Sequence, residues 1–392
     1  DKRRPPPQAG LRHRAPGMAM AAAAELETPA AREWHPGEAQ AKAGLRREIP
    51  VPRPMALAEW VPHTPVRARG LRGLLRVLAY YFVHSARCLG HTPLLLIALW
   101  FHTRRVFGLL TLYYVLRRTN WWNAAVHRFV RFGSSNRPQF LRARREPYDL
   151  QKQYMVSHHP HGVLLCPWFN WLGREELPSA TDPQDKGFST KLKALDGLAV
   201  NLCVAPAVQF YSLHGEIYRD KVTDARSSTM RRILRGSKRK PVKESVMICP
   251  GGFSEAVYTG FSDKYEVAYL RERYGFVKVA IEEGIDIIPT YGFGSADMYW
   301  GWDWKRHERA TLSQKWGLPL VIWSGLFGTN IPRFEDTVTV CFDPFPTSQY
   351  TLGEIEQCHA DYCAYLKVCF DAYKGCCCAT AEKELVFVGK NH

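Results

Sequence analysis

Several features that would assign a protein class are missing from this sequence of 392 residues. No Asn-x-Ser/Thr sequon occurs, and the 11 cysteines show no disulfide-framework spacing, which favours a reduced protein that faces the cytosol. No apolar run follows the first basic residues, so a secretory signal is not expected. No internal repeat is apparent. The chain begins at Asp1 rather than Met, and we expect it to be a fragment or a processed product.

Acidic residues are scarce in the first part of the chain. Residues 1–150 hold 25 of the 53 Lys and Arg but 9 of the 37 Asp and Glu, so the whole net charge of +16 lies there. A basic part attached to a neutral body predicts contact with a polyanion, either nucleic acid or an anionic membrane surface. Residues 1–68, rich in Pro, Ala and Arg, are predicted to be a disordered basic tail.

Residues 69–120 are predicted to be a membrane-associated helical segment. Its first part, 69–89, has the spacing of a basic amphipathic helix, with arginines on one face and leucines on the other. Such a helix can lie in the interface of a membrane. The same pattern is equally typical of a surface helix on a soluble core.

Residues 92–116 favour the membrane interpretation. Two apolar runs, 92–101 and 106–116, flank Arg104 and Arg105. A single span would place both arginines near the bilayer centre, at about 2.5–3.5 kcal/mol each. Either run alone, as a helix, reaches only about 15 Å, half of a roughly 30 Å hydrocarbon core. We therefore expect a shallow or re-entrant membrane-embedded segment.

From about residue 150 the pattern changes to alternating strands and helices. Short apolar runs predict strands over 153–157, 245–249, 285–291 and 337–342. Helical patterns cover 224–236, 265–284 and 352–373. This alternation predicts an α/β domain with a largely parallel sheet, which we place over residues 121–392. Ligands of such sheets bind outside the carboxyl ends of the strands.

The first candidate catalytic constellation is His158-His159-Pro160-His161-Gly162, at the end of an apolar strand. A histidine can take a proton from an alcohol as it attacks a carbonyl, so His159 or His161 is a candidate general base. Glycine lets a bulky substrate approach the backbone. The His-x-His spacing leaves a second interpretation open, a metal-dependent hydrolase, which would need further ligands.

Two further sequence motifs are candidates for binding or catalysis, one directly after the predicted strand 245–249 and one within the predicted helix 265–284. In Pro250-Gly251-Gly252-Phe253-Ser254-Glu255, the glycines free backbone N–H groups to face an oxyanion, and Glu255 could orient a histidine or hold a hydroxyl. The block 271–280 is typical of a basic helix, and its Arg273 could meet phosphate groups of a ligand. Taken alone, a plain turn and a solvated helix face are the simpler alternatives.

In this order the motifs resemble the type-2 diacylglycerol acyltransferase family, which includes monoacylglycerol and wax-alcohol acyltransferases. The family's His-Pro-His-Gly is similar to His159–Gly162, and its Gly-Gly-x-x-Glu is similar to Gly251–Glu255. Its Arg-x-Gly-Phe-x-x-x-Ala block is similar to Arg273–Ala280, and a late block resembles residues 350–374. One acidic residue is absent, because the family's Phe-Gly-Glu is Phe-Gly-Ser at 293–295.

The resemblance implies acyl-CoA as donor and diacylglycerol as acceptor, on the cytosolic face of the endoplasmic reticulum membrane or on a lipid droplet. His159 or His161 would accept the hydroxyl proton, and N–H groups near Gly162 or Gly251–Gly252 would stabilise the oxyanion. No metal, organic cofactor or nucleic-acid partner is implied, and a homo-oligomer is left open. The alternatives are monoacylglycerol or wax-alcohol acylation and a non-catalytic lipid-surface protein.

The densest basic stretch of the neutral part covers residues 226–243. It includes Arg231, Arg232 and Arg235, with few acidic residues beside them in the sequence. CoA carries several phosphate charges, and arginines bind phosphate well, so these three are predicted to hold the donor. A solvated helix facing anionic lipid is the alternative.

Overall fold

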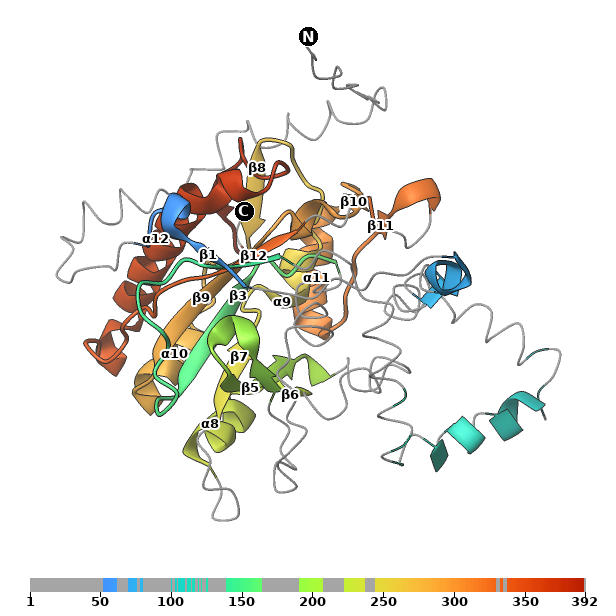
Figure 1. The fold of residues 1–392 in the computed structure, drawn as a ribbon, viewed down its shortest axis with the longest axis horizontal. Coiled ribbons are helices and arrows are strands. Elements are labelled where there is room, and N and C mark those ends of the chain that lie inside the picture. The colour runs from blue at the N-terminus through green and yellow to red at the C-terminus, as the bar shows by residue number, and fades with distance from the viewer. Residues whose placement is uncertain are drawn as a thin grey trace, which may run out of the picture. The chain divides into compact units, whose positions relative to one another are not determined.

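The structure is a computed structural model. It describes residues 52–61, 139–163, 190–206, 222–236, 244–328, 332–333 and 337–390, with scattered residues between 70 and 125 (Figure 1). Most of the predicted basic tail and of the predicted membrane segment lies outside the described residues. Among the helices that are described, none has the length and apolar character needed to cross a bilayer.

A mixed sheet lies at the centre of the fold. In the described part of the chain its strand order is β1 (Glu59–Trp60), β2 (Gln139–Arg142), β12 (Val338–Cys341), β9 (Asp286–Phe293), β3 (Tyr154–His159), β7 (Ser245–Ile248), β5 (Leu198–Val204) and β4 (Thr190–Leu192), with β6 (Val222–Asp224) also beside β5. The central neighbours β9, β3, β7, β5 and β6 are parallel. Antiparallel pairs join β1 to β2, β12 to β9 and β4 to β5. The predicted α/β class with a mostly parallel sheet is confirmed.

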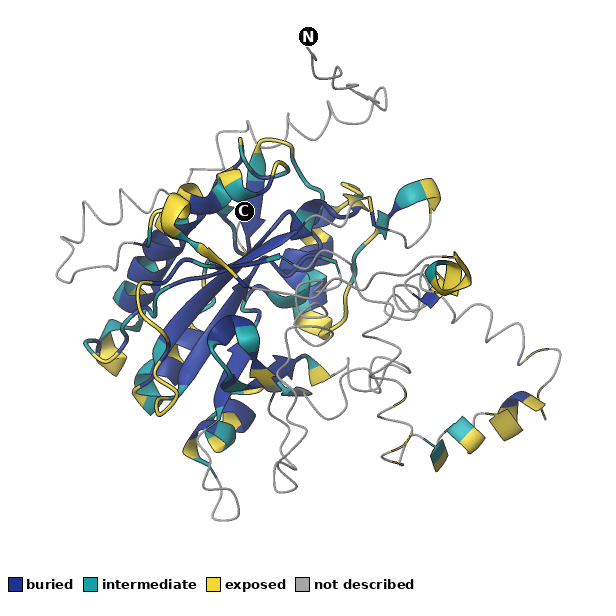
Figure 2. Cartoon of the chain, viewed as in Figure 1, coloured by how far each residue is buried: buried dark blue, intermediate teal, exposed yellow. Residues whose placement is uncertain are grey.

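The central strands are buried on both faces, as parallel strands in α/β proteins usually are. All six residues of β3 are buried. Because side chains alternate along a strand, Met155 packs into the core on one face and Val156 into the core on the other. Figure 2 shows these strands as the buried interior of the described fold.

Three helices cover the first of these cores: α8 (Ser227–Arg235), α10 (Gly275–Glu283) and α12 (Ile355–Tyr373). Each presents apolar side chains to it, such as Met230, Phe276 and Phe370. The turn before α12 is a short 3-10 helix, η8 (Leu352–Glu354), which Thr351 and Glu354 close with a capping box. Two further helices, α9 (Gly252–Ala256) and α11 (Arg306–Trp316), pack against each other.

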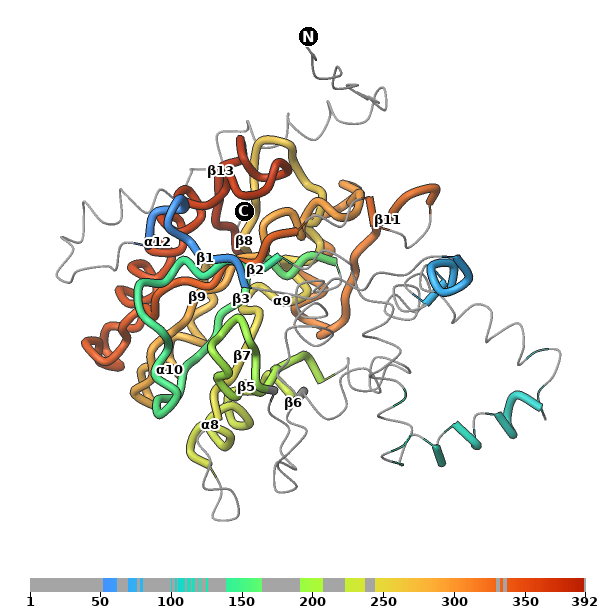
Figure 3. Tube along the Cα trace, viewed as in Figure 1, coloured from blue at the N-terminus to red at the C-terminus, as the bar shows by residue number. Residues whose placement is uncertain are grey.

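The strands predicted at 153–157, 245–249, 285–291 and 337–342 are confirmed as β3, β7, β9 and β12, with ends within two residues of the prediction. The helix predicted over 265–284 is wrong in its first half. Tyr265–Ala268 is the strand β8, which pairs in parallel with β13 (Glu384–Phe387) near the end of the described chain (Figure 3). Glu272 then has a left-handed φ of 63°, which no helix interior allows.

Residues 52–61 correct part of the predicted disordered tail. They form a short 3-10 helix, η2 (Met55–Leu57), followed by β1. The N–H of Val61 donates to the Phe140 carbonyl at 2.8 Å, and the hydroxyl of Tyr373 donates to the Arg53 carbonyl at 2.5 Å. A backbone partner in β2, far along the chain, therefore orders a segment whose own composition gives no such signal.

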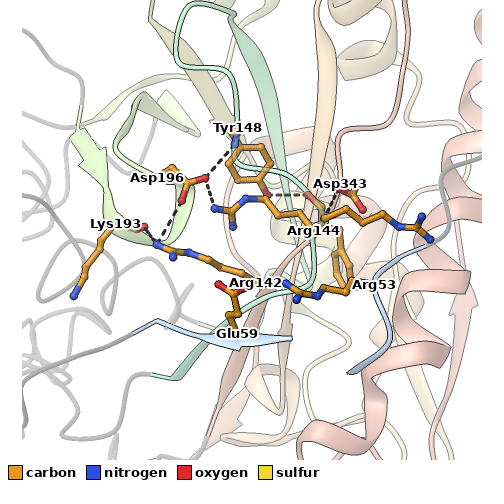
Figure 4. Close-up of polar contacts among 10 residues, drawn as sticks. Arg53, Glu59, Arg142, Arg144, Tyr148, Lys193, Asp196 and Asp343 are labelled. Atoms are coloured by element: carbon orange, nitrogen blue, oxygen red, sulfur yellow. Dashed lines mark hydrogen bonds and ion pairs between the residues drawn. The ribbon is translucent and has the colours of Figure 1, made fainter. Parts of the chain in front are cut away.

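A polar network closes the edge of the sheet where β3 and β5 begin (Figure 4). Arg144, just after β2, forms an ion pair with Asp196 in the turn before β5. The N–H of Tyr148 donates to Asp196 at 3.1 Å, and the Tyr148 hydroxyl donates to the carbonyl of Phe342 at 2.8 Å. These contacts hold the edge of the sheet at which the parallel strands begin, here called the amino edge. The candidate site lies at the opposite edge, where these strands end.

Candidate active site

The two predicted catalytic loops meet at the carboxyl edge of the sheet. His159 ends β3, and His161 and Gly162 follow it, while Gly251 and Glu255 follow β7. Because β3 and β7 are parallel neighbours, both loops leave the sheet at the same edge. The structure therefore brings His159, His161, Gly162, Gly251, Gly252 and Glu255 into one region.

His159 is fully buried and held by two hydroxyl groups. Its Nε2 atom lies 2.8 Å from Ser157 Oγ and 3.1 Å from the hydroxyl of Tyr362 on α12. Its Nδ1 atom is buried without a hydrogen-bond partner in the described structure. Burial lowers the pKa of His159 to about 3, so this imidazole is neutral at physiological pH.

His161 has a defined tautomer. Its Nδ1 atom lies 2.7 Å from the carbonyl oxygen of Gly162, and since a carbonyl only accepts, Nδ1 carries the ring proton. The Nε2 atom therefore keeps a free lone pair. Burial lowers the pKa of His161 to about 4, although the Gly162 bond raises it. A neutral imidazole with its lone pair on Nε2 is the form that a general base needs.

Glu255 holds the histidine loop by its backbone. One carboxylate oxygen accepts the N–H of His161 at 2.5 Å, and the other accepts the N–H of Tyr269 at 2.8 Å. Burial raises the pKa of Glu255 to about 7, while these two N–H groups and Arg273 lower it. We expected Glu255 to orient a histidine ring or hold a hydroxyl. In the structure its carboxylate accepts the backbone N–H of His161, and the Gly162 carbonyl contacts the ring.

Gly162 and Gly251 lie so close to neighbouring atoms that a larger side chain would not fit at either position. A Cβ on Gly251 would lie 2.1 Å from Oε2 of Glu255, and a Cβ on Gly162 would lie 3.1 Å from the carbonyl oxygen of Ser295. Gly162 also has a φ of +60°, which favours glycine. The N–H of Gly252 donates to the Cys249 carbonyl at 3.1 Å, so it is already used and does not point to an oxyanion.

Arg273 lies beside this site, in the turn before α10, whereas the sequence predicted it to lie within a helix. Its guanidinium donates to Ser254 Oγ at 3.2 Å and lies 5.3 Å from the ring centroid of Tyr269. Burial lowers the pKa of Arg273. These contacts hold the start of α9, which carries Glu255.

The three arginines of α8 lie elsewhere. Arg231 forms an ion pair with Glu282 at 2.5 Å, Arg235 pairs with Glu283 at 2.8 Å, and Arg232 is exposed. Gln153, just before β3, donates to the Leu234 carbonyl at 2.6 Å, so this end of α8 lies at the amino edge. The structure does not bring these arginines to the histidine loop, and their acidic partners, which do not lie beside them in the sequence, come from α10.

Two buried polar contacts, one at the site and one outside it, were not predicted. Tyr362 was noted only as part of the late block, yet it contacts His159. Lys383, just before β13, binds Asp297 at 2.6 Å and lies 3.5 Å from the buried Glu266. No local pattern reveals either contact, because each joins segments far apart in the sequence. Within the described residues no group of three or more His, Cys, Asp or Glu side chains could hold a metal ion.

The fold and the histidine loop define an α/β protein with a candidate general base at the carboxyl edge of its sheet. The family model for diacylglycerol acyltransferase matches residues 94–388, and the chain belongs to this family. The predicted resemblance is therefore confirmed. No solved structure matches the chain.

Individual relatives are similar to this chain at about a quarter identity. Diacylglycerol O-acyltransferase 2B of Umbelopsis ramanniana is 27% identical over 246 residues, which cover 58% of this chain and 65% of the relative. Diacylglycerol O-acyltransferase 2 of Xenopus tropicalis is 27% identical, covering 57% of this chain and 61% of the relative. The human 2-acylglycerol O-acyltransferase 3 is 26% identical, covering 60% and 69%. The chain thus spans about two thirds of the length of these relatives.

Proposed function

We propose that this protein transfers a fatty acyl group from acyl-CoA to the hydroxyl of diacylglycerol. The observation that carries the proposal is the state of His161, a neutral imidazole whose Nδ1–H is fixed by Gly162 and whose Nε2 lone pair is free. Family membership and the names of the diacylglycerol acyltransferases to which the chain is similar support the substrate pair.

In the proposed reaction His161 Nε2 accepts the proton of the acceptor hydroxyl as its oxygen attacks the thioester carbonyl. The new ester bond forms, the bond from carbonyl carbon to sulfur breaks, and the imidazolium returns the proton to the leaving thiolate. No covalent acyl-enzyme is needed. We assign His161 rather than His159 as base, because Nε2 of His159 is engaged by Ser157 and Tyr362.

The surrounding groups would position this base. Glu255 fixes the backbone of His161, and the N–H of Gly162, which makes no hydrogen bond within the described structure, is the candidate oxyanion donor. The second candidate acceptor is a monoacylglycerol. It is favoured by the similarity to the human 2-acylglycerol O-acyltransferase 3. Labelled acyl-CoA with a panel of monoacylglycerol, diacylglycerol, fatty alcohol and sterol separates these acceptors.

Single histidine variants test the assignment. His161→Ala is expected to lower kcat by about 10²–10⁴-fold, the usual contribution of a general base. His159→Ala is expected to cost less in kcat and more in thermal stability, because His159 is wholly buried. His307→Ala, outside the site, is the matched control. Full activity in both His159→Ala and His161→Ala would refute the proposal.

We also propose that residues 69–120 attach the protein to the cytosolic face of the endoplasmic reticulum membrane. Described residues at 70–79 are helical, and Leu71, Leu74, Leu75 and Leu78 are exposed, which is consistent with an apolar face that lipid would cover. Apolar burial is not screened by salt, so high salt should release little protein from membranes. Complete release by salt, or unchanged membrane binding after deletion of residues 70–120, would contradict this attachment.

A further inference from the structure

A second exposed apolar surface lies far along the chain from residues 69–120. It surrounds the two-stranded sheet of β10 (Trp300–Gly301) and β11 (Trp323–Ser324). We call it the indole surface and define it by five exposed side chains, Trp300, Trp302, Trp304, Ile322 and Phe327, which are 37–92% exposed. Three of these side chains are indoles at alternate positions along the chain, and the segments that carry the five are adjacent. Large exposed apolar side chains that gather in this way are typical of a surface that meets a partner.

The backbone beneath the indole surface is fixed by a buried arginine. Arg309, on α11, donates to the carbonyls of Trp304 at 2.8 Å and Leu320 at 2.9 Å, and also to that of Trp302. The N–H of Trp302 donates to the Ile322 carbonyl at 3.1 Å. The two segments that carry the apolar side chains are therefore held together by polar contacts from below, and the side chains stay at the surface.

Cations lie against the exposed rings. Arg333 lies 4.7 Å from the ring centroid of Trp300, and Lys305 lies 5.5 Å from that of Trp304. Arg306 and Arg309 are buried, and Arg306 pairs with Asp303, so the cations at the exposed rings are Lys305 and Arg333. Trp with adjacent Lys and Arg is the composition that proteins place at the boundary between lipid headgroups and acyl chains. Its charge complements an anionic leaflet.

The indole surface is connected to the candidate active site through α9 and α11. Ser254, next to Glu255 on α9, donates to the Ala310 carbonyl of α11 at 2.9 Å. The backbone at Gly301 passes so close to the turn after α9 that a Cβ there would lie 1.9 Å from the Thr259 carbonyl oxygen. The element that carries Glu255 thus packs directly on the scaffold of the indole surface.

We propose that the indole surface docks on an anionic lipid bilayer, as a contact separate from residues 69–120. The chemistry of the partner is that of a bilayer interface, with acyl chains for the rings and acidic headgroups for Lys305 and Arg333. This contact sets the carboxyl edge of the sheet close to the layer in which a diacylglycerol resides. That last consequence rests on the proposed function, whereas the lipid contact itself does not.

Lipid photolabelling of the full chain tests the contact directly. The protein is reconstituted in phosphatidylcholine vesicles that contain phosphatidylserine and a trace of phosphatidylcholine with a diazirine on its acyl chain. After illumination, lipid adducts are expected on peptides from 300–304 and 321–328, and none on the exposed residues Leu352 and Val368. Adducts on 92–116 without any on 300–328 would overturn the proposal. A stable dimer of the full chain, with no lipid adducts on 300–328, would assign the surface to a second copy and overturn it too.

Acyl-transfer kinetics of surface variants test the lipid contact independently of the photolabelling. The variant Trp302→Ala/Trp304→Ala/Phe327→Ala is compared with the control Leu352→Ala/Val368→Ala. For diacylglycerol presented in the vesicles, the KM of the triple variant is expected to rise about tenfold or more, since each large apolar side chain contributes strongly to partition. For a monomeric short-chain diacylglycerol, kcat and KM should equal those of the wild type. An equal loss with both acceptors would show a structural role and overturn the proposal. If the wild type transfers no acyl group, the proposed function fails, and the photolabelling still decides the lipid contact.

Discussion

The Oε1 atom of Glu255 accepts the backbone N–H of His161 at 2.5 Å. Glu255 belongs to α9, which follows β7, and His161 belongs to the loop that follows the neighbouring strand β3. One carboxylate therefore joins two adjacent strand ends, and its second oxygen binds the N–H of Tyr269 at 2.8 Å. The position of the candidate base depends on this side chain, although the two imidazole nitrogens do not touch it.

Glu255→Gln tests this backbone contact. Glutamine keeps one acceptor oxygen but turns an NH₂ group toward the other N–H, which loses its partner. A buried unsatisfied group costs about 1–3 kcal/mol, so the free energy of unfolding and kcat should both fall. Thermal unfolding and steady-state rates measure the two effects. A variant with wild-type stability and kcat would show that the contact does not position His161.

The stability difference between the wild type and Glu255→Gln is expected to depend on pH. Burial raises the pKa of Glu255 from 4.5 to about 7, so between these values the folded state binds the proton more tightly than the unfolded state. Stability therefore decreases as pH rises through this window. Glu255→Gln lacks this contribution, so the wild type should lose its stability advantage over the variant as pH rises from 4.5 to 7. Melting curves of both proteins across the window measure it. An advantage that grows with pH would contradict the raised pKa.

Tyr362→Phe tests the contact with His159. The Tyr362 hydroxyl lies 3.1 Å from Nε2 of His159. Tyr365, on the same helix, donates to the Asp343 carbonyl at 3.0 Å and lies outside the site, so Tyr365→Phe is the matched control. Each variant should lose about 1 kcal/mol of stability with its hydrogen bond. Only Tyr362→Phe should also lower kcat, because only it changes the support of a site histidine. Equal kcat values for the two variants would contradict a role in the site.

Local pattern was enough to predict the central strands. Runs such as 245–249 are apolar along their whole length because the strand is covered on both faces, and that signal does not depend on distant residues. The strand β8 was predicted as helix because its partner β13 lies more than a hundred residues further on. Residues 52–61 were predicted as disordered for the same reason, since β2 supplies their hydrogen bonds.

The candidate site was predictable to the level of its loops. Parallel neighbouring strands must bring their carboxyl ends together, so the meeting of the His and Gly-Gly blocks followed from the fold class. The sequence could not separate His159 from His161, because the difference comes from Ser157, Tyr362 and the Gly162 carbonyl around the rings. The membrane role of residues 69–120 stays a prediction.

Gly251→Ala tests the close approach between the two loops. A Cβ at this position would lie 2.1 Å from Oε2 of Glu255, so the carboxylate must move away from His161 or Tyr269. We expect a lower melting temperature together with a strong loss of kcat. Gly275→Ala is the control, because no atom lies within 4 Å of a Cβ there and the position is in a helix, where alanine is favoured. If Gly251→Ala behaves like Gly275→Ala, the loops are less tightly fitted than the structure shows.

Arg231→Gln/Arg235→Gln tests the predicted donor site on α8. These arginines pair with Glu282 and Glu283 of α10, at the edge of the sheet opposite His161. This placement favours a structural role, in which the KM for acyl-CoA stays unchanged and the melting temperature falls slightly, since ion pairs that solvent reaches contribute little. The matched variant Glu282→Gln/Glu283→Gln breaks the same pairs but leaves both arginines charged. In the structural role the two variants lose equal stability and share the wild-type KM. If the arginines bind CoA phosphates, only their own removal raises the KM for acyl-CoA, and that result would restore the donor site to α8.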